Sequence, residues 1–287
     1  MHPNILHNGA IQPSATRSLS PGQTGVMNGW GVFSTLRVSR GVLFAFERHW
    51  ARMRRDAELL RVPMPNDPEA FRRDLLRLVE ANAAAEATLR VAVIRNRGGA
   101  FEGVGIERDY DMVAFTTGLA EWGEGVRLAV EPQARHSGCR FAGAKVLSWS
   151  YNLAWLESAK ARGFDEVILL NERGEVAECT SANIFAETDD AVVTPPLTSG
   201  CLPGVTRELL LGDALPRGVR VEERTLTLDD LYSARAVHIT STTRNLLPVL
   251  SIEGRQIQAR PFLSSSLAMS YGKYFESYIA AGTLAVP

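Results

Sequence analysis

The pattern of secondary structure changes partway along the chain. In the N-terminal third, residues 46–60 carry apolar side chains at helical spacing, and a second helix is expected over 68–83, with Pro68 in its first turn. Strands are expected at 88–95 and 110–116. This alternation of helices and strands predicts an α/β unit.

Beyond the segment GLAEWGEG (118–125), which has turn residues and no apolar period, the pattern is different. A helix is expected over 148–163, and then short β segments with turn signals between them dominate, which favours antiparallel hairpins forming a barrel or sandwich. We therefore predict a smaller N-terminal α/β domain over 1–120 and a larger, barrel-like C-terminal domain over 121–287. Within the larger domain, helices are expected at about 204–214 and 260–280, and strands at 219–226 and 236–241.

Charge and hydropathy exclude several classes of partner. The 31 basic and 32 acidic side chains leave a net charge of -1, which supplies no general attraction to nucleic acid. No apolar run approaches the roughly 18 residues that a membrane-spanning helix needs. The first residues, MHPNILHNGAIQPS, lack the basic and apolar regions of a signal peptide. We expect no nucleic-acid or membrane partner and a cytoplasmic location.

The cysteines predict neither disulfides nor a metal site. Cys139, Cys179 and Cys201 are odd in number and widely spaced, with no CxxC pair. Buried thiols are the ordinary expectation for them.

Lysine is rare in this chain, which makes each one informative. Arginine accounts for 28 of the 31 basic residues, leaving Lys145, Lys160 and Lys273. Lys145 is the only charged residue between Arg140 and Glu157. Burial among apolar neighbours lowers the pKa of an amine and makes it a nucleophile able to form a Schiff base. The alternative is a lysine whose stem packs while its head reaches water.

Glu178 is a second candidate, in the predicted strand EVAECT. Strict alternation puts Val176, Glu178 and Thr180 on one side and Ala177 and Cys179 on the other. A carboxylate on that side is suited to keeping a pyridine nitrogen protonated, or else it is an edge residue or part of a structural ion pair.

Two loops are candidates for binding an anion. LTSGCLPGVTRELLL runs from a Gly/Pro loop into a helix, whose first amides belong to Val205 and Thr206. HITSTTRNLLP offers three consecutive hydroxyl groups, Ser241, Thr242 and Thr243. Arg52 is the candidate counter-charge, although ordinary helix caps and a solvated basic helix face remain the alternatives for these groups.

Together these segments resemble a known family. ERHWARM, the stretch from Lys145 to Phe185, and TPPLTSGCLPGVTRELLL are similar to the class IV (fold type IV) pyridoxal-phosphate enzymes. That family includes branched-chain aminotransferases, D-amino-acid aminotransferases and aminodeoxychorismate lyase. The resemblance implies a two-domain fold with the cofactor in the cleft between the domains, and homodimers whose sites are completed by the neighbouring subunit.

Carried over residue by residue, the resemblance assigns a role to each candidate. Lys145 becomes the Schiff-base lysine and proton shuttle for pyridoxal 5'-phosphate, and Glu178 the partner of the pyridine nitrogen. Trp149 lies near the position of a tyrosine in several relatives, and an indole offers only an N–H donor there. The cofactor phosphate would be held by Arg52, Val205, Thr206, Ser241, Thr242 and Thr243.

Substrate contacts are expected in the first domain. In VFSTLRV, the side chains of Phe33, Thr35 and Arg37 share one face, and Arg37 is suited to a carboxylate unless it is a surface arginine. Arg95 and Arg97, in the glycine-rich loop that follows the third strand, are further candidates for a substrate carboxylate.

The resemblance leaves the reaction open among three possibilities. Transfer of an amino group from an amino acid or amine to a 2-oxo acid is favoured, because the STT segment looks like that of the aminotransferases. Thr35 matches a threonine of 4-amino-4-deoxychorismate lyase, which releases pyruvate and 4-aminobenzoate. The segment Arg95 to Phe101 departs from the lyase pattern RG-x-GG-RGY, lacking its second arginine and its tyrosine. A catalytically silent family dimer is the third possibility.

Overall fold

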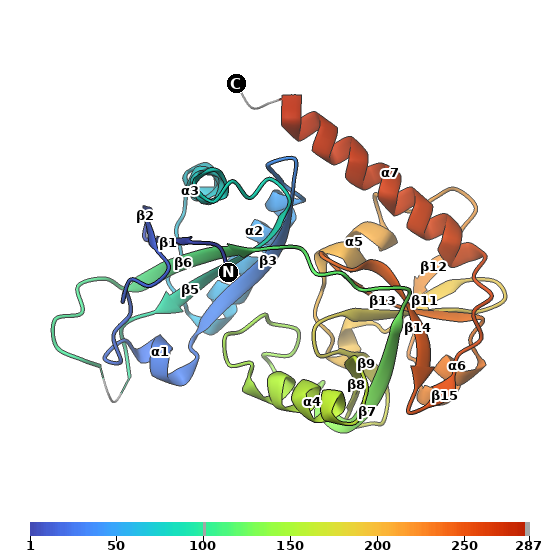
Figure 1. The fold of residues 1–287 in the computed structure, drawn as a ribbon. Coiled ribbons are helices and arrows are strands. Elements are labelled where there is room, and N and C mark those ends of the chain that lie inside the picture. The colour runs from blue at the N-terminus through green and yellow to red at the C-terminus, as the bar shows by residue number, and fades with distance from the viewer. Residues whose placement is uncertain (100–101, 285–287) are drawn as a thin grey trace. The chain divides into compact units, whose positions relative to one another are not determined.

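The computed structural model describes residues 1–99 and 102–284, and the backbone alone at Leu284. The chain forms two compact units (Figure 1). Of the described residues, the first contains those of Met1–Ala120, Ala144–Trp149 and Ser277–Leu284, and the second contains Glu121–Gly143 and Ser150–Glu276. Lys145 therefore packs with the first unit, whereas the sequence analysis assigned it to the second domain, because apolar periodicity does not reveal which domain a connecting segment packs against.

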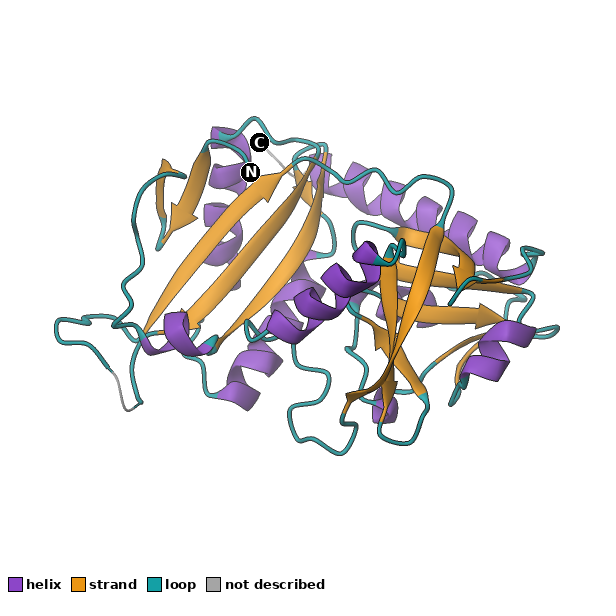
Figure 2. Ribbon diagram, turned by 60° about the horizontal axis from the view of Figure 1, so that its bottom comes forward, coloured by secondary structure: helices purple, strands orange, loops and turns teal. Residues whose placement is uncertain are grey.

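The first unit is built on one antiparallel sheet of six strands, in the order β2-β1-β6-β5-β3-β4 (Figure 2). Side chains of α2 and α3 form a core with one face of this sheet, where Leu36, Leu89 and Met53 are buried. α2 begins and ends where the apolar spacing predicted, and the Asp67 carboxylate caps α3. The elements are β1 (Asn4–His7), β2 (Ala10–Pro13), α1 (Thr24–Asn28), β3 (Gly31–Ser39), β4 (Val42–Leu43), α2 (Phe46–Leu60), α3 (Pro68–Ala81), β5 (Ala87–Arg95) and β6 (Tyr110–Thr117).

The second unit is built on a curled sheet of nine strands. Its main path runs β12-β11-β10-β13-β14-β7-β8-β9, with β15 paired to β14. The elements are β7 (Val126–Arg135), α4 (Ser150–Ala161), β8 (Glu166–Asn171), β9 (Val176–Cys179), β10 (Asn183–Glu187), β11 (Val192–Thr194), the 3-10 turn η1 (Leu197–Ser199), α5 (Val205–Leu211), β12 (Val221–Glu223), α6 (Leu228–Ser233), β13 (Ala236–Ser241), β14 (Asn245–Ile252), β15 (Arg255–Gln256) and α7 (Leu263–Leu284). The last part of α7, from Ser277, belongs to the first unit.

The predicted fold class and the barrel-like second domain are confirmed, but the expected pairing of the strands needs correction. The pairs β7–β8, β7–β14 and β11–β12 are parallel, so the sheet is mixed rather than a series of antiparallel hairpins. α4 is the crossover between β7 and β8, and a parallel connection of this kind requires such a helix. The turn signals located the strands without revealing which of them pair in parallel.

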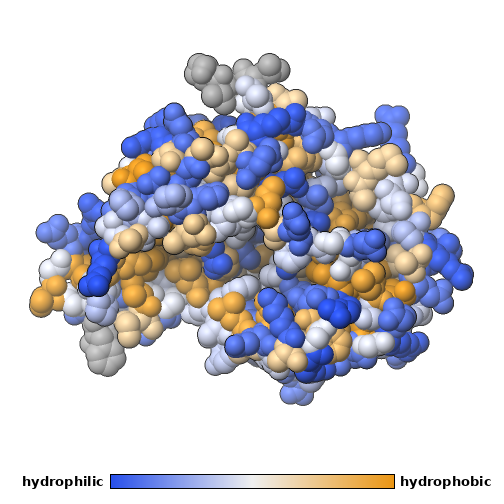
Figure 3. All heavy atoms as spheres, in the orientation of Figure 1, coloured by the Kyte–Doolittle hydropathy of each residue, from blue (hydrophilic) through white to orange (hydrophobic). Residues whose placement is uncertain are grey.

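Hydrophilic side chains cover much of the face shown in Figure 3, and groups of apolar side chains lie between them. Among the described residues, no helix combines the length and the hydropathy needed to cross a membrane.

The start of α7 depends on one buried carboxylate. Glu187, at the end of β10, is 1% exposed and accepts hydrogen bonds from the amides of Phe262, Leu263 and Ser264 and from the Ser264 hydroxyl. Burial alone would raise the pKa of this carboxyl, but the Ser264 hydroxyl and the three amides outweigh burial and lower it. The charge also complements the positive end of the helix.

We predict that Glu187→Gln lowers the free energy of unfolding at neutral pH by about 1–3 kcal/mol, since it removes a buried charged acceptor. The pKa of Glu187 is lowered in the folded state. The contribution of its carboxylate to the free energy of unfolding is therefore complete above the pKa of the unfolded chain, about 4.3, and disappears as the pH falls through the pKa of the folded protein. Urea unfolding of the wild type and the variant from pH 7 to pH 3 measures this difference.

Asp189→Asn is the control, because the Asp189 side chain is 90% exposed in its ion pair with Arg235, and we expect a change within about 0.5 kcal/mol. A Glu187 variant as stable as this control would contradict the assigned role.

Candidate active site

The segment that carries Lys145 is held against the edge of β3 by main-chain hydrogen bonds. The amide of Phe33 donates to the Lys145 carbonyl at 3.1 Å, and the amide of Leu147 donates to the Gly31 carbonyl at 2.9 Å. The Lys145 amide donates at 3.0 Å to the carboxylate of Asp56 on α2, a residue 1% exposed. The lysine backbone is thus fixed on both sides before any ligand is considered.

The Lys145 side chain lies over an aromatic ring. Its Nζ is 4.7 Å from the centre of the Phe33 ring, within the range of a cation–π contact. The indole of Trp149 meets the same ring edge to face, with the ring centres 6.3 Å apart. The predicted residues Phe33, Lys145 and Trp149 are therefore brought together.

A polar chain runs from α2 to β3 beside this group. His49, Arg52 and Asp56 are spaced to share one side of α2. Arg52 Nη2 donates to the Ser34 hydroxyl at 2.9 Å, and that hydroxyl is 2.8 Å from Nδ1 of His49. His49 is 1% exposed, and burial, together with the positive charges of Arg52 and Lys145, lowers its pKa well below 6.5. A neutral imidazole beside two cations avoids adding a third positive charge.

Arg90 is a functional candidate that sequence reasoning missed. Its guanidinium lies 3.9 Å from the centre of the Phe33 ring and 5.9 Å from that of Trp149. Burial lowers its pKa, although an arginine stays charged. No hydrogen bond or ion pair to Arg90 is formed within residues 1–99 and 102–284. Strand alternation was the signal that could have indicated it. Thr35 and Arg90 are paired in the sheet, so their side chains lie on the same face.

The other predicted substrate residues lie in two places. Thr35 and Arg37 are half-buried and share the face of β3 that carries Phe33. Arg95 lies over the Trp30 ring at 4.2 Å and donates to the carbonyls of Arg97 and Arg61. Arg97 donates to the Ile106 carbonyl and pairs with Asp109. Internal contacts thus occupy both of these guanidinium groups. In the loop that leads from Arg97 to Ile106, residues Ala100 and Phe101 lie outside the described residues.

In the second unit, Glu178 lies beside a bulge in β9. Leu169 pairs with Glu178 and Leu170 with Val176, so Ala177 is the extra residue. Val176 and Cys179 consequently enter the same apolar core, and Glu178 does not share a face with Val176 as strict alternation predicted. A one-residue bulge reverses the alternation, and the sequence carries no mark of it.

The Glu178 carboxylate has defined partners. Arg135 Nε donates to one oxygen at 3.0 Å, and the amide of Leu202 donates to the other at 3.0 Å. Arg135 is held in turn by Asn152, whose Oδ1 accepts from Nη2 at 3.2 Å. Glu178 is 8% exposed, and both of its carboxylate oxygens accept a hydrogen bond.

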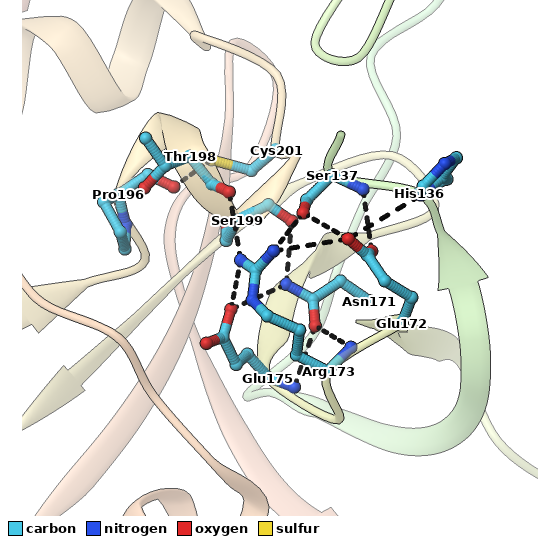
Figure 4. A network of polar contacts seen from close by, with 10 residues as sticks. All are labelled: His136, Ser137, Asn171, Glu172, Arg173, Glu175, Pro196, Thr198, Ser199 and Cys201. Carbon is cyan, nitrogen blue, oxygen red and sulfur yellow. Dashed lines mark hydrogen bonds and ion pairs between the residues drawn. The ribbon is translucent and has the colours of Figure 1, made fainter. Parts of the chain in front are cut away.

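The loop that supplies the Leu202 amide is supported by a polar network (Figure 4). Arg173 donates to the Glu175 carboxylate, the Ser137 hydroxyl and the Thr198 carbonyl. Asn171 Nδ2 donates to Glu175 at 2.8 Å and to the Ser199 carbonyl at 3.2 Å. The β8–β9 turn is thereby tied to η1, just before the chain reaches Leu202 and α5.

The predicted anion-binding residues of this unit lie at the start of α5 and in the β13–β14 turn. Val205 and Thr206 are each 2% exposed, and Thr206 Oγ1 is buried with no hydrogen-bond partner among the described residues. A side chain in place of Gly204 would collide with Asn183, so the approach to α5 requires glycine. Ser241, Thr242 and Thr243 are half-buried at the turn. The unpaired Thr206 hydroxyl is the group expected of a site that accepts a polar ligand.

Comparison with known proteins gives a consistent result. Residues 31–252 match the family model for amino-transferase class IV. A D-alanine aminotransferase of Bacillus licheniformis is 28% identical over 257 residues, 88% of this chain and 89% of its own length. A putative branched-chain-amino-acid aminotransferase of Methanocaldococcus jannaschii is 30% identical over 258 residues, with coverage of 88% and 89%.

A solved structure shares the fold. It is a branched-chain amino acid aminotransferase from T.th., complexed with N-(5'-phosphopyridoxyl)-L-glutamate. This enzyme superimposes with a TM-score of 0.86 at 25% identity, over 97% of this chain and 95% of that one.

The environment of His49 makes a prediction about its charge. Because its pKa is lowered, the folded protein should keep this imidazole neutral at pH 6, where the same side chain in the unfolded protein, with a pKa of about 6.5, is mostly protonated. The contribution of the neutral His49 side chain to the free energy of unfolding is therefore complete above about pH 6.5. It is lost as the pH falls toward the pKa of His49 in the folded protein. Nuclear magnetic resonance of ¹⁵N-labelled histidine measures the titration, and a His49 signal that titrates near pH 6.5 would contradict the assigned environment.

Proposed function

The chain belongs to the class IV aminotransferase family, and from that membership we propose that it moves an amino group between an amino acid, or an amine, and a 2-oxo acid. The proposed cofactor is pyridoxal 5'-phosphate, held covalently by Lys145. The phosphopyridoxyl-glutamate in the similar branched-chain enzyme supports both the cofactor and an amino acid substrate. The observation that carries the proposal is the position of Lys145, fixed by Asp56 and β3 with its amine over Phe33.

The residues of this chain suit that cofactor. Its phosphate needs donors, and Arg52, the unpaired Thr206 hydroxyl and the groups of Val205 and Ser241 to Thr243 are the candidates. Its ring nitrogen needs an anion, and Glu178 is a buried carboxylate. When bound, the cofactor supplies an electron sink that makes the α-proton of the substrate acidic.

Each side chain then has a defined task. Lys145 takes the α-proton as a general base and returns it at a different carbon. Glu178, held in place by Arg135, pairs with the ring nitrogen and keeps it protonated. Arg90 and Arg37 offer guanidinium groups to substrate carboxylates on the face of β3 that carries Phe33, and Arg95 and Arg97 remain candidates for the same task. Trp149 packs on Phe33 and so limits the space beside the lysine.

The second candidate is 4-amino-4-deoxychorismate lyase activity. Thr35, half-buried on the same face as Phe33, is the observation that favours it, since a hydroxyl is a group that can deliver a proton. The internal contacts of Arg95 and Arg97 give no separate support to this reaction. A silent dimer is the remaining alternative.

We also propose that the protein is a homodimer in the cytoplasm. α4 supports an association because Tyr151 and Leu153 are exposed by 75% and 53%. Sedimentation equilibrium should give twice the chain mass of 31.4 kDa, and Leu153→Asp should shift the equilibrium toward monomer. A wild type that stays monomeric at all concentrations would contradict the dimer.

Single-turnover reactions separate the candidate activities. With D-alanine, D-glutamate, L-leucine or an (R)-amine as the only substrate, a transaminase should convert the bound cofactor from its aldehyde to its amine form, which absorbance records. Aminodeoxychorismate should instead give pyruvate and 4-aminobenzoate with the cofactor unchanged if the lyase assignment is correct. A protein that binds the cofactor and responds to none of these compounds would be the silent dimer.

Glu178→Gln tests the partner of the ring nitrogen. We expect turnover to fall by about 10²-fold or more, as for loss of one preorganised electrostatic contact, while cofactor occupancy changes little. Glu222→Gln, in a surface ion pair with Arg220, is the control and should leave both unchanged. Equal losses of turnover and occupancy in Glu178→Gln would disprove the assigned role.

A further inference from the structure

The β13–β14 turn is short, and the side chains packed below it position its hydroxyl groups. Ser241 pairs with Asn245 at the ends of the two strands, and the amide of Arg244 donates to the Ser241 carbonyl at 3.1 Å. Ser241, Thr242 and Thr243 are half-buried, so they are accessible in part. The residue that completes the turn, Arg244, has no role in the function proposed above.

The Arg244 side chain is buried below the turn, with 8% of its area exposed. Its guanidinium carbon lies over the Trp122 ring, 4.0 Å from the ring centre. The guanidinium donates at 3.1 Å to the Ser181 carbonyl and at 3.2 Å to the Glu166 carboxylate. The Trp122 indole donates at 3.2 Å to the carbonyl of Thr243. The turn is therefore held by a stacked guanidinium and by an indole N–H.

Glu166, the partner of Arg244, is 1% exposed and has both oxygens satisfied. One oxygen accepts from the Thr180 hydroxyl and the Val167 amide, and the other from the Ser181 hydroxyl and Arg244. Thr180 and Ser181 belong to the same segment as Glu178, from which Cys179 alone separates them. Glu166 thus connects the turn to the segment that carries the proposed partner of the ring nitrogen.

A buried ion pair of this kind gives little net stability, because desolvation of the two charges offsets their attraction. Its effect is geometric, since the planar fork of an arginine fixes direction as well as distance. Replacing the arginine leaves the Glu166 charge with one donor fewer and the turn without its support.

We propose that Arg244, with Glu166 and Trp122, is a positioning group that sets the spacing between the hydroxyls of the β13–β14 turn and the Glu178 segment. This inference rests on the proposed function, in which these two places bind the phosphate and the ring nitrogen of one cofactor. Arg244 acts through the turn and touches no cofactor atom. Its loss should therefore weaken binding of the phosphate group selectively.

The test compares two ligands that differ only in the phosphate. Arg244→Met keeps most of the side-chain length and removes the charge and the hydrogen bonds. We expect its dissociation constant for pyridoxal 5'-phosphate to rise at least tenfold, while that for pyridoxal changes less than twofold. Arg220→Met, which removes an arginine more than half exposed from a surface ion pair, is the matched control and should change neither.

Two further measurements keep the proposal falsifiable if Arg244→Met folds poorly. Trp122→Phe removes the indole N–H to Thr243 and keeps an aromatic ring under Arg244, so it should weaken pyridoxal 5'-phosphate binding by a smaller factor, again without affecting pyridoxal. Hydrogen exchange of the Arg244 amide in the protein without cofactor should be faster in either variant than in the wild type.

The outcomes separate cleanly. Equal weakening for both ligands, or unchanged binding of pyridoxal 5'-phosphate, would overturn the positioning role. Hydrogen exchange at the Arg244 amide that is as slow in both variants as in the wild type would also overturn the positioning role, in a measurement made without cofactor. A wild type that binds neither ligand would instead refute the proposed function, while the exchange comparison would still decide whether Arg244 holds the turn.

Discussion

The position of Lys145 depends on a hydrogen bond between its backbone amide and a buried carboxylate. Asp56 accepts from that amide at 3.0 Å, and β3 holds the same segment through the Lys145 carbonyl and the Leu147 amide. An amine on a flexible four-carbon stem can act repeatedly at one place only if its backbone does not move. The chain achieves this by pairing a connecting segment with a strand that is already part of a packed sheet.

The charges around the two sets of site residues are balanced differently. In the first unit, Arg52, Arg90 and Lys145 are positive, and His49 stays neutral through burial and its cationic neighbours. In the second unit, the candidate anion Glu178 is paired with Arg135, and Glu166 with Arg244. Each of these charged groups has a hydrogen-bond partner or an aromatic face within its own unit.

The sequence predicted the local features well. The bounds of α2 followed from the spacing of apolar side chains, and the rarity of lysine singled out Lys145. The family resemblance is confirmed by the match over residues 31–252, whereas the roles of individual residues remain proposals. The parallel pairs of the second sheet and the bulge that turns Glu178 away from Val176 were not foreseen. The parallel pairs join strands distant in sequence, and the bulge arises from the register of β9 against β8. No local period encodes either.

Arg90 and Arg244 were missed for the same reason. Each is an arginine among 28, and each gains its meaning from residues far along the chain, Phe33 and Trp149 for the first and Glu166 and Trp122 for the second. The packing of residues 144–149 with the first unit is likewise a long-range result that periodicity does not contain.

The most direct measurement of the central claim is covalent trapping. The purified protein, loaded with pyridoxal 5'-phosphate, is reduced with borohydride, digested and mapped by mass spectrometry. The account predicts a phosphopyridoxyl group on Lys145. A label on Lys160 or Lys273, or no label on any lysine, would contradict it.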